Sequence, residues 1–202
     1  MNYYDLLLAK MMSGGGGGGN PDYSSFVDGS FSGVLDISSA TRIKYYGVSY
    51  LDNVTEIKAD NVEELAGYSV SNMNGIENVV FPSLKTMNSN AFRDSKNLEK
   101  IDLGQNVNSV IASTMFYGCL KLNVLVLRKN GVVGLNNINA FQLSPFASGG
   151  AGGTLYVPSA QISSYQSASN WTTILGYANN QIKAIEGSEY ETKYVDGRTI
   201  GA

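Results

Sequence analysis

Few of the side chains that carry out enzyme chemistry are present in this sequence of 202 residues. It contains no histidine and one cysteine, Cys119. Histidine is the commonest general base and metal ligand, so its absence excludes Ser-His-Asp and Cys-His catalysis by the chain's own residues. A single thiol also leaves no thiolate cluster for a metal. We therefore expect a non-enzymatic protein without a cofactor or a metal.

Adjacent carboxylates are the remaining route to catalysis. Glu63 and Glu64 form the only adjacent acidic pair in the central part of the chain. A pair of carboxylates can hydrolyse a glycosidic bond, but neighbouring side chains of an extended segment point to opposite faces. A carboxylate-based, glycan-acting enzyme is therefore kept only as an alternative of another class.

A repeated apolar pattern organises the centre of the chain. The motif Leu-x-x-Ile-x-Leu at 98–103 returns 24 residues later, at 122–127, as Leu-x-x-Leu-x-Leu, and it recurs upstream in steps of 22 residues to about residue 32. This spacing is the length of one coil of a solenoid. We count about six coils of 22–24 residues between residues 31 and 158, the outer ones less regular.

The apolar residues of each motif lie two apart, which on a strand places them on the same side, with the residue between them pointing out. Each coil then needs its neighbours to cover its inner row, so stability is collective. The pattern predicts two buried ladders with Lys58 and Asp102 exposed between them. The ladders are Ile57, Val79, Ile101 and Leu125, and Ala59, Phe81, Leu103 and Leu127.

The second half of each coil also repeats. Ala-Phe-x-x-Ser at 91–95 corresponds to Met-Phe-x-x-Cys at 115–119. Together with the first motif, this resembles the BspA-like leucine-rich repeats of bacterial surface proteins and of phages that infect gut bacteria. The resemblance extends over residues 32–127. It implies a β-rich α/β fold, a right-handed solenoid with a parallel sheet on one face and short helical turns on the other, and it makes Cys119 a buried residue.

The ends of the chain differ from the repeats. Residues 1–12 can form a short amphipathic helix that contacts a partner chain or another copy, and an expression tag is the alternative. Residues 13–30 contain a glycine tract and read as a linker and lead-in. We expect residues 159–186 to form a helical cap with a buried Trp171. Residues 181–186 alternate like one more strand, and residues 187–202 form a polar tail that is either a hairpin or disordered.

Charge and hydropathy limit the partners. The chain carries 14 Lys+Arg against 17 Asp+Glu, with no basic run, which argues against nucleic acid as a partner. No apolar stretch is long enough to span a membrane, and the start does not have the pattern of a secretory signal.

We expect a protein that is virion-associated, or cytoplasmic before assembly, with the bacterial cell surface as the alternative. The polyglycine start and the AIEGSEYE tail resemble phage-encoded members.

The outward row of the strands is the candidate contact surface for a protein or a cell-surface glycan. Its late part is apolar and rimmed by charge, as interaction sites often are. The residues concerned are Lys100, Asp102, Val124, Val126 and Tyr156. The alternative is structural, because β-branched residues suit strands and a glycine-rich loop at 148–153 can cover them. Four tyrosines of the early coils are expected to cover the outer edge of the stack, and an aromatic platform that binds sugars is the alternative for them; they are Tyr45, Tyr46, Tyr50 and Tyr68.

Overall fold

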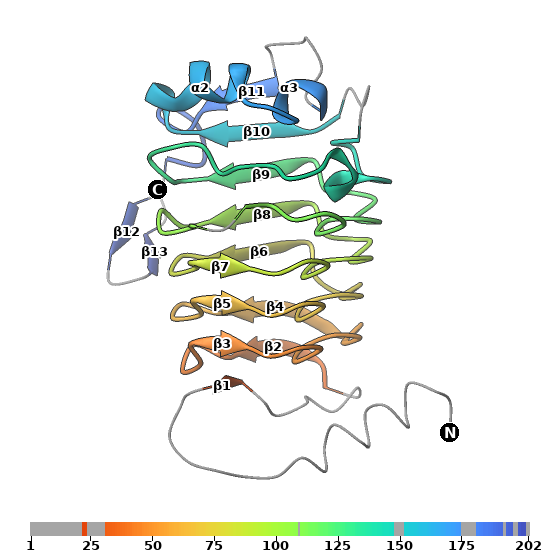
Figure 1. Ribbon diagram of the computed structural model, residues 1–202. Coiled ribbons are helices and arrows are strands. Elements are labelled where there is room, and N and C mark those ends of the chain that lie inside the picture. The colour runs from red at the N-terminus through yellow and green to blue at the C-terminus, as the bar shows by residue number, and fades with distance from the viewer. Residues whose placement is uncertain are drawn as a thin grey trace.

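The computed structural model describes residues 22–23, 31–108, 110–147, 152–174, 181–191, 193–195 and 198–200. The anchor expected at residues 1–12 and most of the lead-in at 13–30 lie outside the described residues. In the described part, successive coils stack along one axis, with β1 at one end and the helices α2 and α3 at the other (Figure 1).

Parallel strands from successive coils form the main face of the stack (Figure 1). At the first coils, β2 (Gly33–Asp36) pairs with β4 (Val54–Lys58). A five-stranded sheet then follows in the order β6, β8, β9, β10 and β11. Its strands are Asn78–Phe81, Lys100–Leu103, Val124–Leu127, Thr154–Val157 and Ile182–Ala184. Between β4 and β6 the strand pairing is interrupted.

A second, narrower parallel sheet runs along another side of the early coils. It contains β1 (Asp22–Tyr23), β3 (Arg42–Ile43), β5 (Glu64–Leu65) and β7 (Thr86–Met87). Its line continues as an isolated bridge between Ile111 and Leu135. The fold is thus the predicted β-solenoid, with two strand faces on its early coils.

The predicted register is confirmed wherever strand pairing defines it. Val79 lies opposite Ile101, Ile101 opposite Leu125, and Leu125 opposite Leu155. Every member of the two predicted ladders is buried. Lys58 is exposed, as expected, whereas Asp102 is not. Alternation along each strand therefore predicted the inward row correctly.

The segments that follow β3, β5 and β7 are hydrogen-bonded turns without the helical form that the resemblance implied for this face. Hydrogen bonds join the turns of successive coils in ladders, for example Val70 N–H to Ala91 O (2.9 Å) and Phe92 N–H to Met115 O (3.1 Å). Each turn contains residues with positive φ at equivalent positions. Within the described coils, a helical turn replaces this arrangement only at η1 (Ile138–Phe141).

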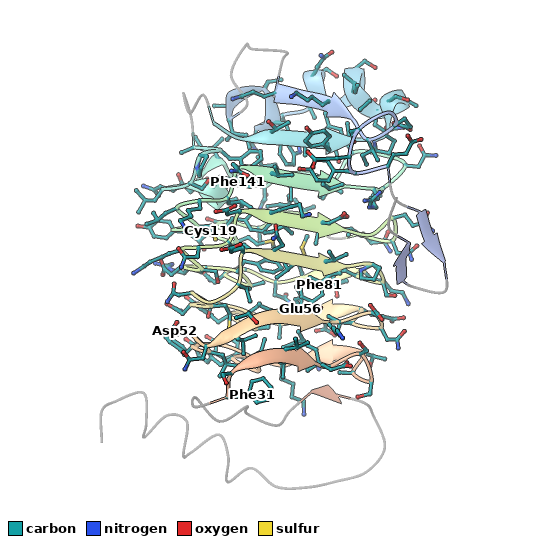
Figure 2. The ribbon with its side chains drawn as sticks, turned by 180° about the vertical axis from the view of Figure 1, so that it is seen from behind. Phe31, Asp52, Glu56, Phe81, Cys119 and Phe141 are labelled. Carbon is teal, nitrogen blue, oxygen red and sulfur yellow. The ribbon has the colours of Figure 1, made fainter. Side chains whose placement is uncertain are left out.

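Aromatic rings fill the interior of the later coils. Phe92, Phe116 and Phe141 occupy equivalent positions and stack, with ring centroids 5.6 and 4.9 Å apart. Phe81 contacts the first of them edge-on at 5.9 Å. Phe81, Phe141 and Cys119 are labelled in the interior in Figure 2. At the position of Phe92 the earlier coil has Val70, so the ring column stops at the third coil.

The cap closes the last coil with η2 (Ser159–Gln161), α2 (Ile162–Ser167) and α3 (Trp171–Ile174). Trp171 is fully buried, as predicted, and its ring contacts Phe141 at 6.0 Å. The single helix expected is divided in two before Trp171, where Asn170 has φ 64°. The alternating segment after the cap forms β11, a further strand of the sheet.

Of the two alternatives for the tail, a hairpin or disorder, the structure has the hairpin. β12 (Lys193–Val195) and β13 (Arg198–Ile200) pair antiparallel. The Asp196-Gly197 turn itself lies outside the described residues.

Candidate interaction surface

The outward row of the main sheet divides into an open and a covered part. In the strand register Asp36 pairs with Lys58, and further along Val80, Asp102 and Val126 follow one another. This is the column predicted from the sequence, and Tyr156 continues it. What differs along the column is access to solvent.

The open part lies over β2, β4 and β6. Here the face forms an open groove of about 610 Å³ at the place where strand pairing is interrupted. Glu56, on β4, is labelled on this face in Figure 2. Its lining contains three carboxylates and one ammonium group, which gives it an acidic character. The charged and polar residues that line it are Asp36, Ser38, Glu56, Lys58, Asp60 and Asn78.

The prediction that Asp102 is exposed is wrong. Its carboxylate accepts hydrogen bonds from Nε and Nη2 of Arg128, both at 2.8 Å. The side chains of Arg128 and Asp102 are only 8% and 6% exposed. A buried charge is tolerated when it is paired and hydrogen-bonded, and this two-point contact meets that condition.

The prediction that Val126 is exposed is also wrong, because Val126 is fully buried. The segment after β11 passes over this part of the sheet, where the Tyr190 ring lies 4.5 Å from the Tyr156 ring and 5.5 Å from Lys100 Nζ. Arg128 Nη2 also donates to Tyr190 O at 2.9 Å. Burial raises the pKa of Tyr190 to about 12.

Val124, Lys100 and Tyr156 are half-buried beside this cover. The five predicted residues are thus neighbours in space, and Tyr190, from residues 185–191, covers part of them through its contacts with Tyr156 and Lys100. Sequence reasoning missed Arg128 and Tyr190. The sequence did offer one sign of this contact: Arg128 directly follows an apolar strand. If such an arginine is buried, it requires an anionic partner nearby.

The side chains considered above for catalysis, the Glu63–Glu64 pair and the Cys119 thiol, lie in different coils. Glu63 and Glu64 each pair with a cation of an adjacent coil, Lys85 at 2.7 Å and Arg42 at 3.1 Å. Cys119 is buried, and this burial raises the pKa of its thiol to about 12. In the part of the chain that the structure describes, no group of His, Cys, Asp and Glu side chains could hold a metal ion. No helix in that part has the length and apolarity needed to cross a bilayer.

Comparison with known proteins identifies the repeat. The family model described as "BspA type Leucine rich repeat region" matches residues 24–144, in 6 copies. The matched region runs from the residues before β2 through η1 and contains the whole groove. No curated protein matches the chain.

Proposed function

Because the chain belongs to the BspA-type leucine-rich-repeat family, we propose that it is a non-enzymatic interaction protein that binds a protein partner through the groove over β2, β4 and β6. The groove carries this proposal, because it is the open part of the outward row, whereas Tyr190 and Arg128 cover the continuation of that row. Repeat solenoids offer such faces as extended binding surfaces.

The charge of the groove indicates the kind of partner. Its carboxylates outnumber its single lysine, Lys58, so a partner with a basic surface fits best. Complementary charge mainly increases the association rate and discriminates between partners, and salt screens it. We therefore expect binding that weakens as ionic strength rises.

The proposal also concerns where the protein acts, on a phage particle or on a bacterial surface. We propose a virion-associated role, supported by the likeness of the glycine tract and of the tail to phage-encoded members. A bacterial cell-surface adhesin fits the same family equally well. Detection of the protein in purified phage particles would favour the first role, and detection in the surface fraction of a bacterial culture would favour the second.

Charge reversal tests the contact surface. A Glu56→Lys variant reverses the charge of one exposed carboxylate of the groove and so removes its excess of negative charge. A matched control is Asp52→Lys, which makes the same charge reversal at an exposed residue outside the groove lining. We expect the partner captured by the wild-type chain from host extracts to bind the control and not the groove variant. Equal capture by all three proteins would contradict the proposal.

A further inference from the structure

Four tyrosines gather on the turns of the first two coils. Tyr45, Tyr46 and Tyr50 belong to the turn after β3, and Tyr68 belongs to the turn after β5. Ring centroids are 4.5 Å apart for Tyr45 and Tyr46, 5.1 Å for Tyr46 and Tyr68, and 6.2 Å for Tyr46 and Tyr50. Tyr45 is 50% exposed and Tyr50 is 40% exposed. We call these four residues the tyrosine cluster.

The cluster combines aromatic faces with hydroxyl groups. The Tyr46 hydroxyl is hydrogen-bonded to that of Tyr45, and Tyr50 and Tyr68 lie close enough to influence Tyr46 electrostatically. Burial, followed by these neighbours, raises the pKa of Tyr46 above its ordinary value. Phenol groups are uncharged at neutral pH, so the cluster offers both apolar area and hydrogen-bonding groups.

The backbone at these positions does not favour tyrosine. Tyr46, Tyr50 and Tyr68 have φ between 56° and 64°, in the left-handed region. A bulky residue there costs about 1–2 kcal/mol, whereas Gly, Asn and Asp are tolerated. Later coils follow this rule, with Asn90 in the position of Tyr68 and Asn72 in the position of Tyr50.

Thr114 is the exception among the later coils. Its hydroxyl donates to Asn90 Oδ1 at 2.7 Å, which supplies a structural reason for its presence. In the tyrosine cluster, the Tyr46 and Tyr68 rings pack on each other instead, with centroids 5.1 Å apart. Disfavoured backbone conformations are retained at sites where a side chain serves a function.

The second coil is shaped to accommodate the cluster. Gly67 occupies the position that Tyr45 has in the first coil. A Cβ at Gly67 would lie 3.1 Å from the Tyr45 ring. Glycine at this position therefore leaves room for the Tyr45 ring to extend over the second coil, towards Tyr68. The cluster is thus built jointly by two coils.

We propose that the tyrosine cluster is a binding site for a neutral glycan built from sugars with equatorial hydroxyls. Such sugars have flat C–H faces that pack on tyrosine rings, and hydroxyls that hydrogen-bond with phenol groups. An anionic polysaccharide would need cationic groups, and the cluster supplies none of its own. The site is separate from the acidic groove, whose lining contains no tyrosine, so it goes beyond the proposed function.

Titration of the full chain with cellohexaose, chitohexaose and xylohexaose tests the proposal. We expect at least one of the three oligosaccharides to bind, and the Tyr50→Asn, Tyr68→Asn variant to lose at least about tenfold in affinity. Both substitutions place the residue of the next coil at the same backbone position, so thermal stability should be maintained or increased. A Tyr45→Phe, Tyr50→Phe variant removes only hydroxyls, and we expect it to bind more weakly while its rings still pack.

The matched control is Tyr117→Asn, which removes a tyrosine from a turn of the fourth coil, where Arg93 lies 4.5 Å from the ring centroid. This control and the Glu56→Lys groove variant should bind the oligosaccharide as the wild type does. The proposal is overturned if none of the three binds at millimolar concentration, or if binding persists in the Tyr50→Asn, Tyr68→Asn variant. It is equally overturned if that variant only changes the oligomeric state, because the cluster would then be a contact between two copies.

Discussion

Trp171 donates its indole N–H to the carbonyl oxygen of Val133 at 2.8 Å. The N–H of the same residue, Val133, donates to the Tyr165 hydroxyl, also at 2.8 Å. Both polar groups of one buried peptide segment of the last coils are therefore satisfied by side chains of the cap. A helical cap that only covered apolar area would have left these two groups without partners.

Two substitutions at Trp171 distinguish how much its ring and its indole N–H group each contribute to the stability of the cap. Trp171→Phe keeps an aromatic ring against Phe141 but leaves Val133 O without a donor, so we expect a loss of about 1–3 kcal/mol in the free energy of unfolding. Trp171→Ala also leaves a cavity and should lose about 3–5 kcal/mol. Urea denaturation measures both. Thr172→Ala, at an exposed position of the same helix, is the control and should change stability by less than about 0.5 kcal/mol.

The buried pair of Asp102 and Arg128 should be far more sensitive than a surface pair. Asp102→Asn leaves the Arg128 charge buried without its counterion, and we expect a cost of about 3–5 kcal/mol. The exposed pair of Arg42 and Glu64, at 42% and 36% side-chain exposure, is the comparison. Glu64→Gln should cost less than about 1 kcal/mol.

Asp102→Asn should also weaken the contact of residues 185–191 with the sheet. Because Arg128 also binds Tyr190 O, Asp102→Asn should increase amide hydrogen exchange and proteolytic cleavage in residues 185–191. Unchanged protection of this segment in a folded variant would contradict a role for Arg128 in holding it in place.

Cys119 should make the stability of the protein depend on alkaline pH. Its pKa is about 12 in the folded chain and about 8.5 in an unfolded chain. Because the folded value is the higher one, this contribution to stability is complete below about pH 8.5 and is lost as the pH rises towards 12. Between about pH 7.5 and 10.5 the wild type should lose more stability than Cys119→Ser, by at least about 1 kcal/mol.

Serine is the appropriate substitution for this comparison. The Cys119 thiol donates to Phe92 O at 3.1 Å, and in the preceding coil the Ser95 hydroxyl makes the equivalent bond to Val70 O at 3.1 Å. Cys119→Ser should therefore preserve the contact at neutral pH. Tyrosines with raised pKa values are present in both proteins and cancel in the difference. Parallel pH curves would contradict the assignment.

Close backbone contact between coils predicts a severe effect at Gly104. A Cβ at this position would overlap the carbonyl oxygen of Pro82 in the preceding coil. The spacing of the coils is fixed by the sheet, so Gly104→Ala should lose stability near the upper end of the about 1–3 kcal/mol typical of overpacking. Thermal unfolding measures it. Gln105→Ala, at the exposed neighbouring position, should leave the melting temperature unchanged.

The inward row of the solenoid could be predicted from sequence because two periods determine it. Alternation within a strand determines which face of the sheet Ile101 and Leu103 lie on. The spacing of 22–24 residues determines which residues of the next coil they contact. Both periods are local properties of the chain. The strand register and the burial of the two ladders were therefore correct without any knowledge of long-range contacts.

Exposure of the outward row could not be predicted in the same way. Alternation shows that Asp102 and Val126 point away from the core, but not whether another segment covers that side. The cover is provided by Tyr190, which contacts Arg128 across 62 positions of sequence. No repeat period extends over that distance, so the burial of Asp102 and Val126 could not be predicted from the repeats.

Because of the column of phenylalanine rings, we expect the first coils of the solenoid to unfold locally more often than the coils near the cap. The column runs from Phe81 to Phe141 and joins the cap through Trp171, whereas the equivalent position in the second coil is filled by Val70. Smaller buried side chains contribute less to holding neighbouring coils together. In a linear stack each coil depends on its neighbours, so amide protons should exchange first at β2 and last near Phe116. The acidic groove and the tyrosine cluster both lie at the end that opens most readily, and occupation of either should therefore be detected as a slowing of exchange in β2 and β4.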